Sequence, residues 1–214
     1  EFREGFISWV SSLSDVFKGE VVAIDGKTLR RSHDRSSGKS AIHMVSAWAS
    51  KASLVLGQIK TAEKSNEITA IPELLRLLDL KGCLISIDAM GCQKKIATDI
   101  TEKQADYLLA VKDNQPKLHA GIAEYFADVA DGRRAKTDVF ENKHEGHGRV
   151  EIRRCHVGYE VKKMPFYNDW PTLKSVVMIE SERRQNGETT LEYRYYVCSR
   201  VAGAEELLNA TRTH

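Results

Sequence analysis

The stretches VVAID (21–25) and CLISID (83–88) decide the fold, because each is a short apolar run that ends in an aspartate. Short runs rich in β-branched residues are typical of buried strands. A carboxylate at the end of a buried strand is costly unless a cation or hydrogen bonds compensate its charge. If the two strands are parallel neighbours, Asp25 and Asp88 end at one sheet edge, as a pair of oxygen ligands suited to Mg²⁺ or Mn²⁺. The plainer alternative is that each aspartate only caps the turn after its strand.

The remaining sequence predicts helices and strands around these two runs, from apolar residues at helical spacing or in β-branched runs. Asn186-Gly187, between two strand patterns, predicts a hairpin turn. Crossover connections favour parallel pairing of the strands that end at residues 25, 88 and 112. The predicted class is α/β, a mixed sheet flanked by helices, with a β-rich stretch in the second half. The expected helices are 2–17, 67–80, 92–104, 115–130 and 203–213, and the expected strands are 21–25, 41–49, 53–60, 83–88, 106–112, 149–157, 173–182 and 189–198.

The composition is that of an ordinary globular chain with a weak net charge. Of the 214 residues, 42% are hydrophobic and 29% are charged, and the net charge of +2 permits a nucleic-acid partner without requiring one. The four cysteines form no C-x-x-C pair, so we expect neither a zinc site nor a disulfide framework, and a reducing cytoplasm fits best. No apolar run approaches the roughly 20 residues of a membrane span, so we expect no membrane partner.

Polar and basic residues follow the strand ends. Gly26 and Lys27 come directly after Asp25, and this pair would let a phosphate approach closely and neutralise it. The helix that begins near Gln93 would place its N-terminus, which favours phosphate, beside Asp88. The competing interpretation is a solvated charged face, the commoner fate of any basic run. The residues that we predict to contact a nucleic-acid backbone are Lys27, Arg30, Arg31, Gln93, Lys94, Lys112, Asn114, Gln115 and Arg149.

Five motifs spread over the chain resemble one known group of proteins, the bacterial H-repeat-associated proteins and their insertion-sequence transposase relatives. The resemblance implies an RNase H-like fold and DDE chemistry, in which DNA is cut at transposon ends and then joined by a 3′-hydroxyl. It implies that Asp25 and Asp88 are the first and second acids, with Mg²⁺ or Mn²⁺ as cofactor. It also implies double-stranded DNA, both transposon ends and target, as partner, and it allows a homodimer. The motifs are AIDGKTLR (23–30), EKSNEITAIPELL (63–75), DAMGCQ (88–93), DYLLAVKDNQ (106–115) and HGRVEIR (147–153).

The third acid of the DDE set is the difficult part of this resemblance. In the family it lies in a C-terminal helix, within a pattern like H-W-x-I-E-N, and this sequence stops at His214, where that pattern would begin. Glu151 is the one tempting substitute, but its neighbours Val150 and Ile152 make it an outward residue of an alternating strand. We therefore expect Glu151 to be structural or DNA-facing. We also expect a region that recognises DNA ends to be missing, and the chain alone to be inactive or badly impaired.

The expected organisation has four parts, and two further functions fit the same residues. Residues 1–18 form an N-terminal helix, 19–132 the RNase H-like core, 133–201 a β-rich insertion and 202–214 the start of a truncated C-terminal helix. The first alternative function is an RNase H-like nuclease that cuts without strand transfer, which an assay for joined DNA would distinguish. The second is a degenerate or domesticated transposase that acts as a DNA-binding module, which would be insensitive to metal.

Overall fold

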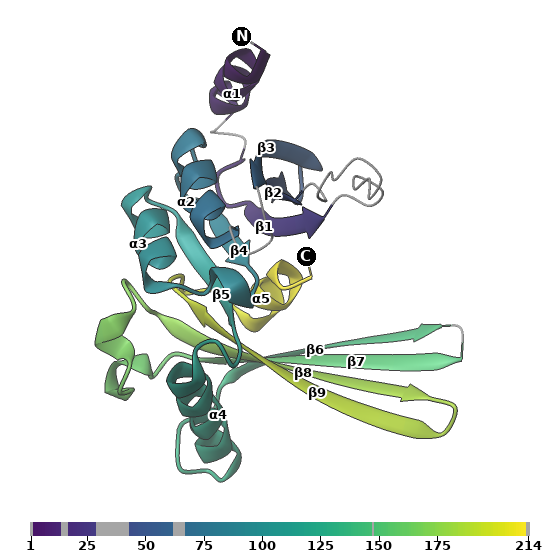
Figure 1. The fold of residues 1–214 in the computed structure, drawn as a ribbon. Coiled ribbons are helices and arrows are strands. Elements are labelled where there is room, and N and C mark those ends of the chain that lie inside the picture. Colours follow the sequence, from purple (N-terminus) through teal and green to yellow (C-terminus); the bar gives the residue numbers. More distant parts are fainter. Residues whose placement is uncertain (1, 14–16, 29–42, 62–66, 147, 213–214) are drawn as a thin grey trace, which may run out of the picture. The chain divides into compact units, whose positions relative to one another are not determined.

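The structure, a computed structural model, describes residues 2–13, 17–28, 43–61, 67–146 and 148–212. These residues form two compact units, one that runs up to Tyr107 and one from Leu108 to Arg212. Figure 1 labels α1–α3 and β1–β4 in the first unit and α4, α5 and β6–β9 in the second. Strand β5 (Asp106–Val111) begins in the first unit and continues in the second.

The first unit is built on a mixed sheet with the strand order β3-β2-β1-β4-β5. Strand β1 (Val21–Thr28) pairs antiparallel with β2 (His43–Ala49), which pairs antiparallel with β3 (Leu54–Thr61). On its other side, β1 pairs parallel with β4 (Leu84–Ile87), and all four residues of β4 are buried. A strand buried on both faces needs a continuous apolar sequence, as LISI is. The predicted parallel pairing of the two acid-bearing strands is confirmed.

Helix α2 (Glu67–Leu77) covers one face of this sheet, where it contacts β2 and β3. A Cβ atom on Gly57 of β3 would lie 3.2 Å from the side chain of Leu74 and 3.3 Å from that of Leu78. The glycine therefore lets the helix approach the sheet closely. The β2–β3 register is irregular between Ala47 and Trp48, but side chains alternate within Met44–Ala47 and Gly57–Lys60, so every second residue there faces α2 and the others face the opposite side.

Two further helices belong to the first unit. Helix α3 (Lys94–Glu102) contacts α2 and buries an apolar stripe formed by Ile96, Ala97 and Ile100. Helix α1 (Phe2–Ser12) contacts β3 and is shorter than the predicted helix 2–17. Between β4 and α3 lies a single 3₁₀ turn, η3 (Ala89–Gly91). This short connection keeps the start of α3 close to the end of β4.

The second unit is an antiparallel sheet with the order β5-β9-β8-β7-β6. Helix α4 packs on β9, and α5 packs on β6 and β7. Figure 1 shows β6–β9 as a long twisted ribbon whose far ends extend beyond both helices. The elements are α4 (Pro116–Ala130), β6 (Asp138–Gly146), β7 (Arg149–Gly158), η4 (Val161–Lys163), η5 (Tyr167–Asp169), β8 (Ser175–Gln185), β9 (Glu188–Cys198) and α5 (Ala204–Ala210).

The hairpin predicted at Asn186-Gly187 joins β8 to β9. Both residues have positive φ, 54° for Asn186 and 79° for Gly187, which is the backbone of the tight turn whose twist matches that of the strands. The register continues to the turn itself, with Gln185 opposite Glu188. The dipeptide therefore fixes the register of the longest strand pair in the unit.

The predicted α/β class with a mixed sheet flanked by helices is confirmed, and two strand predictions need correction. Strand β1 does not end at Asp25 but continues to Thr28, because β2 pairs with it along its whole length. Strand β6 was not predicted, since none of its nine residues is buried and its sequence carries no apolar alternation. Pairing with β7, a non-local contact, forms this strand.

Candidate active site

The register of β1 and β4 brings the two predicted acids together. The parallel pairing runs from Val21 opposite Leu84 to Ile24 opposite Ile87, so Asp25 and Asp88 are the next residues on neighbouring strands. Asp88 keeps an extended backbone, with φ −66° and ψ 176°. In-register residues of parallel strands point to the same face, and neighbouring strands lie about 4.8 Å apart. The two aspartates are therefore neighbours across the sheet, which is the arrangement that a shared cation would require.

Asp88 also caps the turn that follows it, as the plainer interpretation anticipated. Its Oδ1 accepts hydrogen bonds from the backbone N–H groups of Met90 at 3.1 Å and Gly91 at 3.4 Å. A carboxylate has two oxygens with several lone pairs, so a cap on Oδ1 leaves Oδ2 capable of binding a cation. Capping and metal binding are thus compatible, and the cap fixes the orientation of the carboxylate.

Asp25 lies inside β1 beside a lysine. The Lys27 Nζ atom lies 3.4 Å from Asp25 Oδ2, and the two side chains are 74% and 33% exposed. Residues two apart on a strand share a face, which explains the contact. An ion pair this exposed contributes little to stability, so the lysine is easily drawn to another anion. Lys27 can therefore bind a phosphate that approaches the acid pair.

The residues after Asp88 lead directly into a helix start. Gln93 is the N-cap residue of α3, without a cap hydrogen bond from its side chain, and the exposed Lys94 is the first residue of the helix. The next residue, Lys95, binds Asp99 at 3.2 Å. Burial raises the pKa of the neighbouring Cys92 thiol to about 12, so this cysteine is protonated at neutral pH.

The other predicted site residues of the described chain lie in the second unit. Lys112 and Asn114 are exposed, and the Gln115 N–H donates to the Lys112 carbonyl at 2.9 Å, which closes the turn before α4. Their convergence on the acid pair stays a prediction. Arg30 and Arg31 fall outside the described residues.

Glu151, the weaker candidate for the third acid, is held by two arginines of its own strand. Its carboxylate oxygens lie 3.0 Å from Arg149 Nε and 3.0 Å from an Arg153 guanidinium nitrogen, and its side chain is 18% exposed. A carboxylate so neutralised is a weak competitor for a metal ion. These contacts are consistent with a structural role for Glu151. They also pair Arg149, a predicted DNA-binding residue, with a carboxylate of its own strand.

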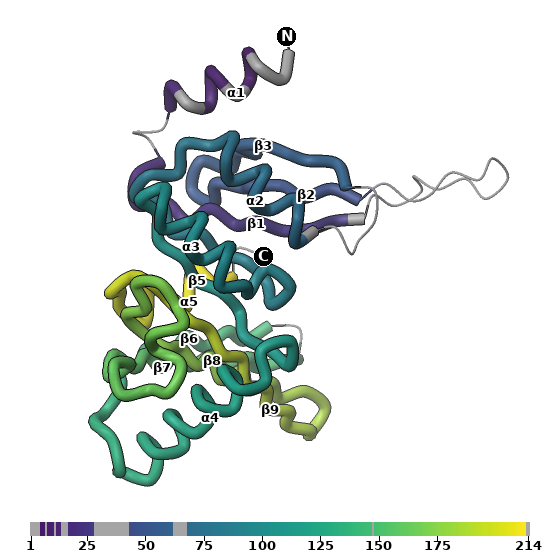
Figure 2. The backbone as a smooth tube through the Cα atoms, turned by 60° about the vertical axis from the view of Figure 1, so that its left-hand side comes forward, coloured from purple at the N-terminus to yellow at the C-terminus, as the bar shows by residue number. Residues whose placement is uncertain are grey.

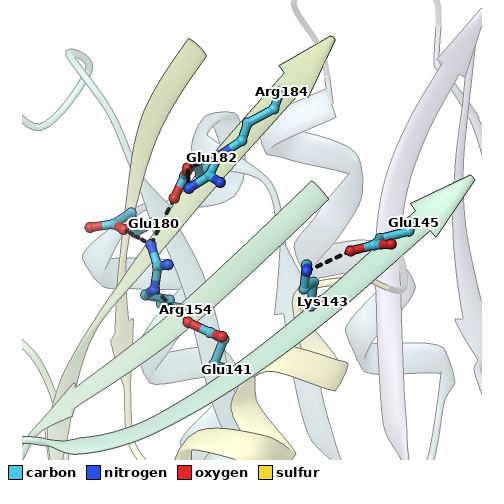
Figure 3. A network of polar contacts seen from close by, with 7 residues as sticks. All are labelled: Glu141, Lys143, Glu145, Arg154, Glu180, Glu182 and Arg184. Carbon is cyan, nitrogen blue, oxygen red and sulfur yellow. Dashed lines mark hydrogen bonds and ion pairs between the residues drawn. The ribbon is translucent and has the colours of Figure 1, made fainter. Parts of the chain in front are cut away.

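Ion pairs compensate much of the remaining basic charge on the hairpins. Figure 3 shows Arg154 among the carboxylates of Glu141, Glu180 and Glu182, with nitrogen–oxygen distances of 2.6, 2.5 and 3.1 Å. These hydrogen bonds, with the Glu180 bond the largest contribution, raise the pKa of the Arg154 guanidinium. Lys143 pairs in the same way with Glu145 at 2.5 Å. The cluster therefore holds the strands together and presents little uncompensated charge to DNA.

The donor chemistry of the acid pair fits a divalent metal ion. Two adjacent carboxylates offer the hard oxygen ligands that Mg²⁺ prefers, and Mg²⁺ usually keeps several waters in addition to one or two carboxylates. Within the part of the chain that the structure describes, no three His, Cys, Asp or Glu residues form a metal-binding group. Asp25 and Asp88, as neighbours on adjacent strands, could each contribute oxygen ligands to such an ion. None of the helices among the described residues is long and apolar enough to cross a membrane.

Sequence reasoning did not select the residues beside Asp25 on the neighbouring strands. Ser46 of β2 is the partner of Asp25, and Gln58 of β3 is the partner of Ser46. They share the face of the acids because residues directly opposite in a sheet point to the same side. The alternation of apolar and polar residues within 43–49 and 54–61 indicates only that Ser46 and Gln58 face outward. Their place next to an acid depends on strand register.

The match to known proteins defines the class. Residues 17–214 match the family described as "Transposase DDE domain", so this chain belongs to that family. It is 47% identical over 218 residues to "Putative transposase YncI" of Escherichia coli O157:H7, which covers all of this chain and 55% of that protein. It is 43% identical over 220 residues to "H repeat-associated putative transposase YhhI" of E. coli K12, covering 100% of this chain and 58% of that protein. The chain therefore spans a little more than half the length of these relatives.

Among solved structures, a piggyBac transposase synaptic complex with hairpin DNA superposes on 92% of this chain and 38% of that one, with a TM-score of 0.43 and 9% sequence identity. A TM-score this low does not establish a shared fold. The family assignment therefore rests on the sequence matches, which confirm the resemblance to H-repeat-associated transposases.

Proposed function

We propose that this chain is the catalytic-core portion of a DDE transposase, in which Asp25 and Asp88 hold the divalent metal ions for DNA cleavage and strand transfer. The observation that carries the proposal is the parallel register of β1 and β4, which makes the two aspartates neighbours on one face. The family match supports the transposase class. The core would comprise residues 19–132, with 133–201 as an insertion, and the partner would be double-stranded DNA, bound by a homodimer.

The residues around the acids can be given distinct roles in this mechanism. When bound, Mg²⁺ or Mn²⁺ supplies activation of the attacking oxygen and charge stabilisation at the leaving oxygen. Asp25 and Asp88 would hold it, and the cap at Met90 and Gly91 would keep the Asp88 carboxylate oriented. Lys27 would exchange its contact with Asp25 for a phosphate oxygen. The N-terminus of α3, with Gln93 and Lys94, would favour the same phosphate through the partial positive charge of the helix end.

The third carboxylate of the DDE set is not supplied by Asp25 or Asp88. DDE chemistry uses three carboxylates, and Asp25 and Asp88 would supply two. Glu151 would take no part, because Arg149 and Arg153 already neutralise it. With two acids, we expect the 214-residue chain to cut DNA weakly or not at all. Robust Mg²⁺-dependent cleavage by the chain alone would contradict this expectation.

Thermal unfolding with and without Mn²⁺ tests the proposed metal centre. A metal ion that binds the folded state stabilises it by RT ln(1 + [L]/Kd), which is about 2.7 kcal/mol at a hundredfold excess over Kd. We expect Mn²⁺ to raise the melting temperature of the wild-type chain and to have almost no effect on Asp25→Asn or Asp88→Asn. The matched control is Glu151→Gln, which should keep the full response. Equal Mn²⁺ shifts in all four proteins would contradict the assignment and favour a metal-independent DNA-binding module.

A further inference from the structure

A strip of outward-facing polar residues continues from the acid pair across the first sheet. In one cross-strand row, Asp25 is the partner of Ser46, and Ser46 is the partner of Gln58. In the next row, two residues along, Lys27 is opposite Met44, and Met44 is opposite Lys60. We call Ser46, Gln58 and Lys60 the β2–β3 strip. Since strands lie about 4.8 Å apart, the row from Asp88 to Gln58 spans roughly 14 Å.

The strip faces away from the helix that covers the sheet. A Cβ atom on Gly57 would point at Leu74 of α2 and at Leu78 just after that helix, so Gln58 and Lys60 point to the opposite side. Ala47, the partner of Gly57, is fully buried, which places Ser46 on the outward face as well. The side chains of Gln58 and Lys60 are exposed. Neither residue is therefore needed for packing against α2.

We propose that the β2–β3 strip binds the phosphate backbone of the DNA strand that enters the acid pair, with Lys60 as its main charged contact. The inference rests on the proposed function and names residues that extend its DNA site. Lys60 gives the strip its positive charge, and Lys27 of β1 lies across Met44 from it, so the two lysines together complement a polyanion. Serine hydroxyl and glutamine amide groups are common neutral donors to phosphate. A strand lying on this face would pass from β3 over β2 to the acids on β1 and β4.

The salt dependence of DNA binding tests the charged part of the proposal. The 214-residue chain is titrated with a fluorescein-labelled duplex between about 50 and 200 mM salt. Loss of one phosphate contact in Lys60→Ala should reduce the slope of log K against log[salt] by about 0.9. Lys51→Ala is the matched control, because Lys51 is an exposed lysine in the turn at the other end of the same hairpin. Lys60→Arg should retain the wild-type slope. Equal slopes for Lys60→Ala, Lys51→Ala and the wild type would overturn the proposal.

Site-directed crosslinking tests on which face of the sheet the DNA lies. The four native cysteines are all buried, so an introduced surface cysteine can be addressed selectively. Gln58→Cys should form a crosslink with a thiol-reactive group on the DNA backbone. Glu73→Cys, at an exposed position of α2 on the opposite face, should not. Equal crosslinking from both positions would contradict the assigned path.

The two experiments separate this inference from the proposed function. If the wild-type chain binds no DNA and shows no Mn²⁺ response, the transposase proposal fails together with the strip. If the wild type binds DNA, Lys27→Ala lowers the salt slope and Lys60→Ala does not, the strip alone is refuted. Melting temperatures of Lys60→Ala and Gln58→Cys near that of the wild type show that a loss of binding is not a loss of folding.

Discussion

At the scale of single residues, the candidate site depends on how Asp88 is held. Asp88 directly follows the buried strand β4 and caps the 3₁₀ turn after it, so backbone N–H groups of the turn hold one of its carboxylate oxygens. The turn is possible because residue 91 is glycine: a Cβ atom there would lie 2.2 Å from Cγ2 of Ile87. Ile87 is the residue before Asp88 and is 1% exposed, so it has little room to move. The local sequence Ile-Asp-Ala-Met-Gly therefore forms one packed unit.

Replacing Gly91 by alanine should disturb this unit. The added methyl group overlaps the Ile87 side chain and comes to 3.2 Å from Ile71, and overpacking of this kind costs about 1–3 kcal/mol. We expect a lower free energy of unfolding in urea and a smaller Mn²⁺ shift. Gly5→Ala in α1 is the control, because a Cβ at this position would meet no other part of the described chain within 4 Å, apart from its chain neighbours and the backbone of its own helix. An unchanged free energy of unfolding for Gly91→Ala would show that the turn accommodates a side chain.

At the scale of elements, the β6–β9 ribbon is stabilised by cross-strand ion pairs in the part where its strands bury few apolar side chains. Beyond the helices, the strands have few buried residues, and β6 has none. Their cross-strand neighbours are instead charged pairs, with Arg154 shared by carboxylates of β6 and β8. Opposite charges placed directly across a sheet contribute to its stability. The guanidinium of Arg154 on β7 thus joins β6 and β8 (Figure 3).

Removal of Arg154 should therefore weaken the ribbon more than removal of a peripheral arginine. Arg154→Ala leaves Glu141, Glu180 and Glu182 without their shared cation, and we expect the melting temperature to fall by roughly 2–4 °C, the equivalent of about 1 kcal/mol. The matched control is Arg184→Ala, since among the described residues Arg184 pairs with the single carboxylate of Glu182. Because partly exposed charges are screened, the difference between the two variants should shrink in high salt. Identical melting temperatures for both variants at low salt would contradict the shared role of Arg154.

At the scale of the whole molecule, the sequence predicts the structures that local patterns determine, such as buried strands and tight turns. The features that it does not predict depend on how the strands are paired and in which register. Apolar runs such as VVAID and LISI predict the strands β1 and β4, and the dipeptide Asn186-Gly187 predicts the hairpin turn between β8 and β9. The extension of β1 to Thr28 was not predictable, because Gly26-Lys27-Thr28 is extended only through its pairing with β2. The positions of Ser46 and Gln58 beside Asp25 are not predictable either, because they depend on the register of β1, β2 and β3.

The same distinction between local patterns and strand register applies to the candidate site. Local patterns selected Asp25 and Asp88, and the structure makes them neighbours through the β1–β4 register. The polar residues after β5 belong to the second unit, and no local pattern determines where they lie relative to the acids. Glu151 could be ranked low from strand alternation, and the contacts with Arg149 and Arg153 give the physical reason. A cross-strand ion network has no signature in either strand alone, so the pairing of Arg154 with carboxylates of β6 and β8 could not be predicted from the sequence.

The most direct test of the central claim is a crystal of this chain soaked in Mn²⁺ and measured for anomalous scattering. The account predicts a manganese peak on the outward face of the first sheet, about 2 Å from a carboxylate oxygen of both Asp25 and Asp88. A well-ordered crystal with no peak there, or with manganese bound to one of the two aspartates and out of reach of the other, would contradict it.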